Sequence, residues 1–211
     1  MTEISKTKKL IIIGAGGHGK VIADIAALNG YREIVFLDND PGIKECEGYP
    51  VMGPDSMAEE LEGDLFIAIG NAELRRKLTE RYDGRTFPLL IHPAAVIAGS
   101  AVIGEGTVVM AGAVVNPGTA VGKGCILNTA CSVDHDCVVG DYCHISVGAH
   151  LCGTVDVGEG SWIGAGTIVS NNLNICPGVM TGAGAVVVKD IAEKGIYTGV
   201  PAKKMKKPAQ G

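Results

Sequence analysis

A six-residue repeat of apolar positions dominates the second half of the chain. Starting from Ile97, an aliphatic residue occupies fifteen of sixteen consecutive sixth positions. The sixteen positions are Ile97, Ile103, Val109, Val115, Val121, Leu127, Val133, Val139, Ile145, Leu151, Val157, Ile163, Val169, Ile175, Thr181 and Val187. A period of six fits neither an α-helix, with its period of about 3.6, nor an alternating strand, with its period of about 2. It is typical of a parallel β-helix built from hexapeptides.

A second position in each hexapeptide carries a small residue. It lies four residues after the aliphatic one and is filled by Ala101, Thr107, Ala113, Thr119, Cys125, Cys131, Cys137, Cys143 and Ala149. Four of the seven cysteines therefore recur with five residues between them, a spacing that matches no zinc site. We expect these thiols to pack inside the β-helix as small core residues.

Glycine adds a longer period to the repeat. Gly104, Gly122, Gly140 and Gly158 each follow an aliphatic position and lie eighteen residues apart. Because eighteen residues are three hexapeptides, this spacing predicts a triangular coil with one short strand on each side. Sixteen hexapeptides then make a little over five coils. We expect these glycines to lie at corners where the backbone needs a positive φ.

The first ninety residues follow a different pattern, in which apolar strands alternate with helices. The predicted strands are Lys9–Ile13, Ile34–Leu37, Leu65–Ile69 and Phe87–Ile91, and the predicted helices are Lys20–Leu28, Ser56–Leu61 and Glu73–Tyr82. This order is typical of a small α/β sheet. We expect the boundary near His92-Pro93, which gives an α/β domain over residues 1–92 and a β-helix domain over 93–211.

A glycine motif follows the first predicted strand. Gly14-x-Gly16-x-x-Gly19, with Asp38 about twenty residues further on, matches the dinucleotide fingerprint. Such glycines let backbone N–H groups approach a pyrophosphate at a helix N-terminus. Three or four strands are about half of a dinucleotide domain. A mononucleotide or a nucleotide-diphosphate sugar therefore fits the domain better than NAD, and a loop without any ligand is the third alternative.

Charge and hydropathy restrict the partners of the chain. A net charge of −5 argues against binding to nucleic acid or to anionic membrane surfaces. The sequence has no apolar run of about 18 residues, the length that spans a bilayer. We expect a cytoplasmic protein without membrane insertion.

The combination of these two parts resembles one family, the sugar acyltransferases of the sialic-acid O-acetyltransferase type. Within it, the chain is similar to N-acetyltransferases that act on UDP-4-amino-4,6-dideoxy sugars in bacillosamine synthesis. The resemblance is carried by Gly14–Gly19, Phe36–Asn39, Phe66–Asn71, Leu127–Gly148 and Gly199–Lys203. It implies a left-handed β-helix, a homotrimer with active sites between subunits, acetyl-CoA as cosubstrate, and no metal.

The resemblance also implies roles for individual residues. His135 matches the general base and Asp136 the acid that raises its basicity, where the family commonly has glutamate. His144 matches a contact to the thioester region of acetyl-CoA, and the backbone at Ala165 and Ala183 matches further contacts to the coenzyme. The positions that match the nucleotide-sugar site are Gly16, Gly17, His18, Asp38, Asn39 and Gly70, with Asn39 replacing a usual acid.

The residue chemistry agrees with acetyl transfer to an amine and leaves alternatives open. An imidazole with an ordinary pKa near 6.5 accepts a proton near neutral pH, and an adjacent carboxylate fixes its tautomer. One alternative is O-acetylation of a sialic acid or acetylation of another nucleotide amino sugar. Another is a metal-dependent hydratase that uses His135, His144 and His150 across a subunit interface, and a further one is a non-catalytic scaffold. Otherwise, we interpret His150 as a surface residue.

Overall fold

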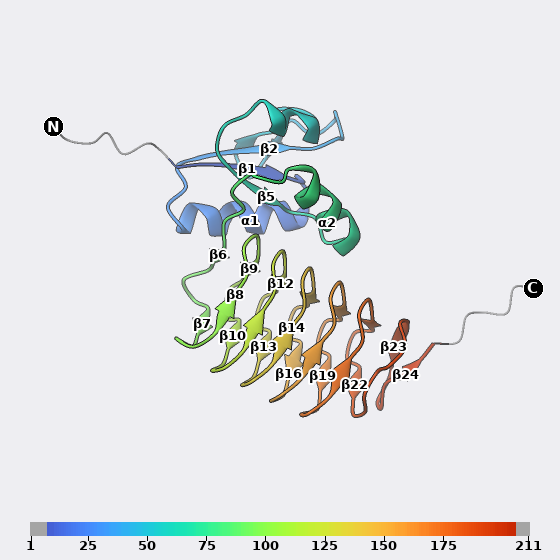
Figure 1. Cartoon of the computed structure of the whole chain (residues 1–211). Coiled ribbons are helices and arrows are strands. Elements are labelled where there is room, and N and C mark those ends of the chain that lie inside the picture. Colours follow the sequence, from blue (N-terminus) through green and yellow to red (C-terminus); the bar gives the residue numbers. More distant parts are fainter. Residues whose placement is uncertain (1–7, 206–211) are drawn as a thin grey trace, which may run out of the picture. The chain divides into compact units, whose positions relative to one another are not determined.

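The protein is described here by a computed structural model, which covers residues 8–205. The chain divides into two compact units, and the division falls between Pro93 and Ala94. The first unit is an α/β unit and the second is a β-helix (Figure 1). The predicted fold class is therefore confirmed at the level of both architectures.

A three-stranded parallel sheet with the order β2-β1-β5 forms the centre of the first unit. Its strands are β1 (Lys9–Ile13), β2 (Glu33–Leu37) and β5 (Asp64–Ile67). The buried part of the central strand, β1, is apolar. Its residue Ile11 is fully buried and lies opposite Val35 in β2 and Leu65 in β5. Continuous apolar runs are expected where a parallel strand is covered on both faces.

Two α-helices accompany this sheet, α1 (Gly17–Leu28) and α2 (Ala72–Arg81). The first begins three residues earlier than predicted, directly after Gly16. The side chain of Asn71 caps α2 by accepting a hydrogen bond from the N–H of Leu74 at 2.9 Å. Neither helix, nor any other helix in residues 8–205, has the length and apolar character to cross a membrane.

Two expectations for this unit need correction, and one element lies outside them. The predicted helix at Ser56–Leu61 is a 3-10 helix, η1 (Asp55–Glu59), because the segment is too short for stable α-helical turns. The predicted strand at Phe87–Ile91 shrinks to β6 (Leu90–Ile91) and does not join the three-stranded sheet, since Pro88 lacks the N–H that a ladder needs. A small hairpin of β3 (Glu45–Cys46) and β4 (Tyr49–Pro50) was not predicted.

The second unit contains sixteen two-residue strands, β7 to β22, whose second residues are the sixteen positions of the sequence repeat. They are β7 (Val96–Ile97), β8 (Val102–Ile103), β9 (Val108–Val109), β10 (Val114–Val115), β11 (Ala120–Val121), β12 (Ile126–Leu127), β13 (Ser132–Val133), β14 (Val138–Val139), β15 (His144–Ile145), β16 (His150–Leu151), β17 (Asp156–Val157), β18 (Trp162–Ile163), β19 (Ile168–Val169), β20 (Asn174–Ile175), β21 (Met180–Thr181) and β22 (Val186–Val187). Two further strands, β23 (Ile196–Thr198) and β24 (Lys203–Lys204), follow.

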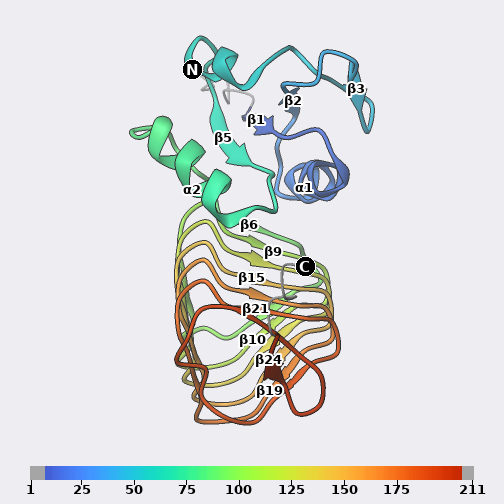
Figure 2. The same cartoon turned by 90° about the vertical axis from the view of Figure 1, so that its right-hand side faces the viewer.

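These strands stack into three parallel faces, and Figures 1 and 2 show the coils following one another along the axis. The β7 face has the order β22-β19-β16-β13-β10-β7, and the β8 face has the order β20-β17-β14-β11-β8. The β9 face contains β21-β18-β15-β12-β9, with β23 and β24 continuing it beyond β21. Val115 pairs with Val133, eighteen residues later, which confirms the predicted coil of three hexapeptides.

The interior positions are filled as the repeat predicts. The second residue of every strand from β9 to β22 is buried, and so are the small residues from Thr107 to Ala149. Cys125, Cys131, Cys137 and Cys143 are all free and buried, and burial raises the pKa of the Cys131 thiol to about 12. These cysteines are core residues, as expected from their spacing.

Glycine recurs every eighteen residues in the β-helix, but the reason predicted for these glycines was wrong. Gly104, Gly122, Gly140 and Gly158 do not have positive φ. Instead, they leave room for the next coil, since a Cβ on Gly104 would lie 2.6 Å from the carbonyl carbon of Gly122. The left-handed conformation occurs two residues after this column and at every sixth residue, with φ from 55° to 75°. It is adopted by Gly106, Gly112, Gly118, Gly124, Ala130, Asp136, Tyr142, Gly148, Thr154, Gly160, Gly166, Asn172, Gly178 and Gly184.

Candidate active site

His135 and Asp136 lie in the turn that connects β13 to β14, at the edge between the β7 face and the β8 face. Asp136 is one of the left-handed residues, with φ 56°. Aspartate tolerates this conformation better than most residues with a side chain. The Nδ1 atom of His135 lies 2.9 Å from Oδ2 of Asp136, and the two side chains are 57% and 66% exposed.

This contact determines which imidazole nitrogen is available for chemistry. An ionised carboxylate only accepts hydrogen bonds. Nδ1 of His135 therefore carries a proton and donates the hydrogen bond to Asp136. In the neutral ring, Nε2 then holds the free lone pair. An acid–imidazole pair of this kind is able to act as a general base.

The electrostatics of the turn favour the protonated imidazole. The hydrogen bond to Asp136 raises the pKa of His135, and the charge of Asp134 adds to this effect. The pKa of Asp134 is itself lowered, because its carboxylate accepts hydrogen bonds from the side chain of Asn116 at 2.7 Å and from the N–H of His135 at 2.8 Å. A base with a raised pKa holds an abstracted proton more tightly.

The next coil provides the surface against which the imidazole lies. The N–H of Thr154 donates to the carbonyl oxygen of His135 at 2.9 Å, which joins the two turns. Gly153 lies beside the ring, and a Cβ on this glycine would lie 2.5 Å from Nε2 of His135. The turn around His135 is therefore held from the preceding coil by Asn116 and from the following coil by Thr154.

His144 lies in another part of the coil, as the outward residue of β15 on the β9 face. Its Nε2 atom lies 3.1 Å from Nδ2 of Asn128. The ring stacks on Trp162, eighteen residues later, with centroids 4.9 Å apart and an interplanar angle of 28°. Trp162 in turn donates from its Nε1 to Oγ of Ser146 at 2.7 Å. The imidazole is thus half-buried and fixed by an amide and an aromatic ring.

Ala165 and Ala183 occupy equivalent corners in consecutive coils, after β18 and β21. Both are exposed, and the N–H of Gly184 donates to the carbonyl oxygen of Ala165 at 2.8 Å. Because neither residue has a side chain beyond Cβ, their backbone is open to close approach.

The glycines of the first unit divide into two groups. Gly14 and Gly19 are needed for packing, since a Cβ on Gly19 would clash with the carbonyl oxygen of Gly14 and one on Gly14 would lie 2.8 Å from the carbonyl oxygen of Ala68. By contrast, a Cβ on Gly16, Gly17 or Gly70 would meet nothing within 4 Å. Gly16 caps α1 and Gly17 is its first residue, so open glycine backbone lies at the positive end of a helix dipole.

His18 follows on α1 as a neutral imidazole. Burial lowers its pKa to about 4, and the nearby charge of Arg75 acts in the same direction. Its Nε2 atom is buried and has no hydrogen-bond partner among residues 8–205. Arg75 is 2% exposed and donates from one guanidinium nitrogen to the carbonyl oxygens of Ile69 and Gly70, at 2.7 and 3.0 Å.

Asp38 and Asn39 come directly after β2, where they line a small cavity of about 130 Å³ together with Gly14 and Asp55. The carboxylate of Asp38 accepts from the N–H of Ala15 at 2.8 Å and from that of Asp40 at 2.9 Å. Asn39 exchanges two hydrogen bonds with Asp55, since its Nδ2 donates to the carboxylate at 3.3 Å and its Oδ1 accepts from the N–H of Asp55 at 3.0 Å. The cavity lies at the carboxyl ends of parallel strands, where α/β sheets bind ligands.

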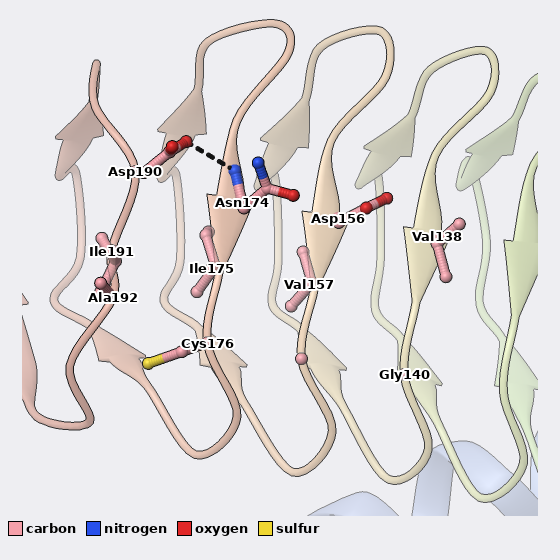
Figure 3. A pocket seen from close by; sticks show the side chains of 11 residues that line it. Val138, Gly140, Asp156, Val157, Asn174, Ile175, Cys176, Asp190, Ile191 and Ala192 are labelled. Atoms are coloured by element: carbon pink, nitrogen blue, oxygen red, sulfur yellow. Dashed lines mark hydrogen bonds between the residues drawn. The ribbon is translucent and has the colours of Figure 1, made fainter.

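A larger groove of about 440 Å³ crosses the outside of the β8 face (Figure 3). Asp156, Asn174 and Asp190 lie along it, and Oδ1 of Asp190 accepts a hydrogen bond from the N–H of Asn174 at 2.9 Å. The groove contains none of the side chains that the sequence predicts for catalysis or coenzyme binding. In addition, the described part of the chain holds no group of three His, Cys, Asp or Glu side chains arranged to bind a metal.

Comparisons with known proteins find relatives of both units. Residues 9–82 match the PglD N-terminal domain. A 108-residue segment is 41% identical to UDP-N-acetylbacillosamine N-acetyltransferase of Bacillus subtilis (strain 168), and it covers 47% of this chain and 50% of that protein. The match thus spans half the length of this curated relative.

Two solved structures match over almost the whole chain. The acetyltransferase domain of PglB from Neisseria gonorrhoeae FA1090, solved in complex with acetyl coenzyme A, is 46% identical with a TM-score of 0.90, covering 94% of this chain and all of that one. PerB from Caulobacter crescentus, solved with CoA and GDP-perosamine, is 38% identical with a TM-score of 0.88, covering 94% of this chain and 97% of that one. The chain belongs to this sugar acyltransferase family.

Within this acyltransferase, the sequence did not lead us to predict several residues that contact the candidate residues. Asn116, Gly153 and Trp162 lie eighteen residues from Asp134, His135 and His144, respectively. The eighteen-residue period therefore contained a signal for each of them, because residues one coil apart lie side by side. No comparable spacing indicates Asn128 or Arg75.

The acyltransferase chain brings some predicted residues together and keeps others apart. His135 contacts Asp136, and Ala165 stacks beside Ala183. His135 and His144 do not belong to the same edge of the β-helix, because one follows the β7 face and the other lies on the β9 face. The single chain therefore does not unite the expected base with the expected coenzyme contacts.

Proposed function

We propose that this acyltransferase transfers the acetyl group of acetyl-CoA to the amino group of a nucleotide-linked amino sugar. The observation that carries the proposal is the exposed His135–Asp136 pair, with Nδ1 held by the carboxylate and Nε2 left available. Family membership supports the same chemistry, since the relatives described above are named as N-acetyltransferases of nucleotide amino sugars or were solved with such a sugar. A UDP-4-amino-4,6-dideoxy sugar is the substrate that we expect.

The proposed reaction needs one proton acceptor. Acetyl-CoA supplies the thioester carbonyl that the sugar amine attacks. A C–N bond forms, the C–S bond breaks, and Nε2 of His135 takes the proton that the amine loses. Asp136 stabilises the resulting imidazolium, and the proton then passes to the departing thiolate.

Acetyl-CoA would lie along the corner formed by Ala165 and Ala183, with its thioester end towards His144. The open backbone of both alanines and the fixed orientation of His144 support this assignment. Because His135 belongs to a different edge of the same chain, we propose that His135 of one subunit meets the coenzyme site of its neighbour. A homotrimer with three sites between subunits satisfies this requirement.

The nucleotide part of the sugar substrate is assigned to the first unit. Gly16 and Gly17 offer open backbone N–H groups for the pyrophosphate, and the neutral His18 offers a lone pair or a proton without adding charge. Asp38, Asn39 and Gly70 complete the expected site. We propose that binding belongs to residues 1–92 and catalysis to residues 93–211, in a protein of the cytoplasm.

Incubation of the purified chain with acetyl-CoA and UDP-, GDP- or dTDP-linked 4-amino sugars tests this proposal. We expect release of free thiol and a mono-acetylated sugar nucleotide with one of these substrates. Hydroxylamine treatment distinguishes the linkage, because it removes an O-acetyl ester and leaves an N-acetyl amide. A product that hydroxylamine cleaves, or turnover only of free sialic acids, would contradict N-acetylation of a nucleotide sugar.

A further inference from the structure

Gly153 occupies a special place in the turn between β16 and β17. It lies eighteen residues after His135 and is buried, and all three of the nearest atoms to a hypothetical Cβ belong to the imidazole of His135. These atoms would lie at 2.5 Å (Nε2), 2.7 Å (Cε1) and 3.2 Å (Cδ2). Real Cβ atoms do not approach other heavy atoms to 2.5 Å, so the ring takes space that only glycine leaves free.

The backbone of Gly153 does not itself require glycine. Its φ lies outside the left-handed region, in contrast to fourteen residues elsewhere in the β-helix turns. The neighbouring ladder bonds join Thr154 to His135 and Asn172 to Gly153, and both use backbone atoms. An added methyl group would therefore leave these bonds in place and press on the imidazole alone.

We infer that Gly153 is a positioning residue for His135 in the proposed acetyl transfer. The inference rests on the proposed function. The missing side chain leaves room for the Nε2 side of the ring against the next coil, while Nδ1 reaches Asp136 at 2.9 Å. A ring displaced by a Cβ would lose the alignment of that hydrogen bond and would move Nε2 away from the amine.

The variant Gly153→Ala tests this role, with Gly99→Ala as its matched control. Gly99 lies in the same column, thirty-six residues before His135, and a Cβ there would meet nothing within 4 Å and needs no positive φ. We expect Gly153→Ala to lower kcat by about 10- to 100-fold, the effect of misplacing a catalytic group by about 1 Å. The KM values for acetyl-CoA and the sugar nucleotide should stay within about twofold of the wild type, and Gly99→Ala should behave like the wild type.

Two further readouts separate positioning from a structural effect. In Gly153→Ala, the acid limb of the kcat/KM profile should move to lower pH, because His135 loses its hydrogen bond to Asp136. In a His135→Ala background, Gly153→Ala should change kcat by less than about twofold, since the ring on which it acts is gone. That double variant also removes the clash, so it should melt at the temperature of His135→Ala.

Three results would overturn the inference. The first is a Gly153→Ala enzyme whose kcat stays within about threefold of the wild type, while the kcat of His135→Ala falls by about 10²-fold. This result would reject the role of Gly153 and leave the proposed function intact. Full loss of activity on adding Gly153→Ala to His135→Ala would show an effect independent of the ring. Wild-type turnover by His135→Ala would remove the role of His135, and that of Gly153 with it.

Discussion

His135 and Asp136 are neighbours in sequence, yet their side chains meet, with Nδ1 and Oδ2 2.9 Å apart. The left-handed backbone of Asp136, at φ 56°, accompanies this contact. Many turns of the β-helix place glycine at the equivalent position, where no side chain is available. The turn of the candidate active site thus uses a recurring backbone feature of the fold to place a carboxylate beside an imidazole.

Replacing Asp136 by asparagine should change the pH dependence of the reaction. Asparagine tolerates the left-handed conformation as aspartate does, so the turn should persist. The hydrogen bond that Nδ1–H of His135 donates to the Asp136 carboxylate is the largest cause of the raised pKa of His135, and a neutral amide in place of the carboxylate lowers that pKa. Because neutral His135 is the active form, the acid limb of kcat/KM should shift to lower pH, and kcat should fall by less than in His135→Ala.

A kcat/KM profile for Asp136→Asn measured from pH 5 to pH 9 checks this shift. Asp134→Asn is a useful companion, since the charge of Asp134 is the second cause of the raised pKa and should give a smaller shift in the same direction. An acid limb of Asp136→Asn that coincides with the wild type would contradict the assigned pairing.

The glycine loop of the first unit should separate binding from stability. Gly17→Val places its side chain in open space, so the protein should fold and the KM for the sugar nucleotide should rise while acetyl-CoA binding is unchanged. Gly19→Ala should instead unfold at lower denaturant concentration, with a loss of about 1 to 3 kcal/mol, because its Cβ would clash with the carbonyl oxygen of Gly14.

Urea unfolding and steady-state kinetics of both variants check these outcomes, with Gly99→Val as the control for an exposed glycine in the other unit. Equal losses of affinity for both substrates in Gly17→Val would show that the glycine loop does not belong to a sugar-nucleotide site.

His18 should make the folded protein sensitive to acid. The unfolded chain takes up a proton on this residue below about pH 6.5, whereas the folded protein does so only near a pKa of about 4. The contribution of neutral His18 to the free energy of unfolding is therefore complete above about pH 6.5. It is lost as the pH falls towards 4. Its size should be about 2 to 3 kcal/mol over this range.

Urea unfolding of the wild type and of His18→Gln at several pH values between 7 and 4 measures this effect. The glutamine variant should lose less stability on acidification, and His150→Gln, a change at an exposed histidine, should follow the wild type. Parallel curves for the wild type and His18→Gln would contradict a buried neutral imidazole.

The β-helix could be predicted almost residue by residue because its interior repeats. Each coil buries the same positions, so Ile97 to Val187 mark sixteen strands without a shift. Close approach of the coils at Gly104 and positive φ at Gly106 both favour glycine, and a sequence does not distinguish these two causes.

The α/β unit and the site depend more on tertiary context. Local pattern indicates β1 and α2, and Pro88 was itself a signal in the sequence against the strand predicted at Phe87–Ile91. Likewise, the motif identified His135 and Asp136, whereas the role of Gly153 arises from the space between two coils. The eighteen-residue period places Gly153 one coil after His135, but the close contact between the two residues depends on how the ring packs.

The rate of His135→Ala tests the central claim most directly. The side chain of His135 is exposed and takes no part in the core, so the variant should fold and keep its affinity for acetyl-CoA. We expect kcat to fall by roughly 10²- to 10⁴-fold, the usual contribution of a general base, while His150→Ala retains wild-type turnover. A folded His135→Ala enzyme that turns over within about threefold of the wild type would contradict the account, and direct attack by an already neutral amine would explain the reaction better.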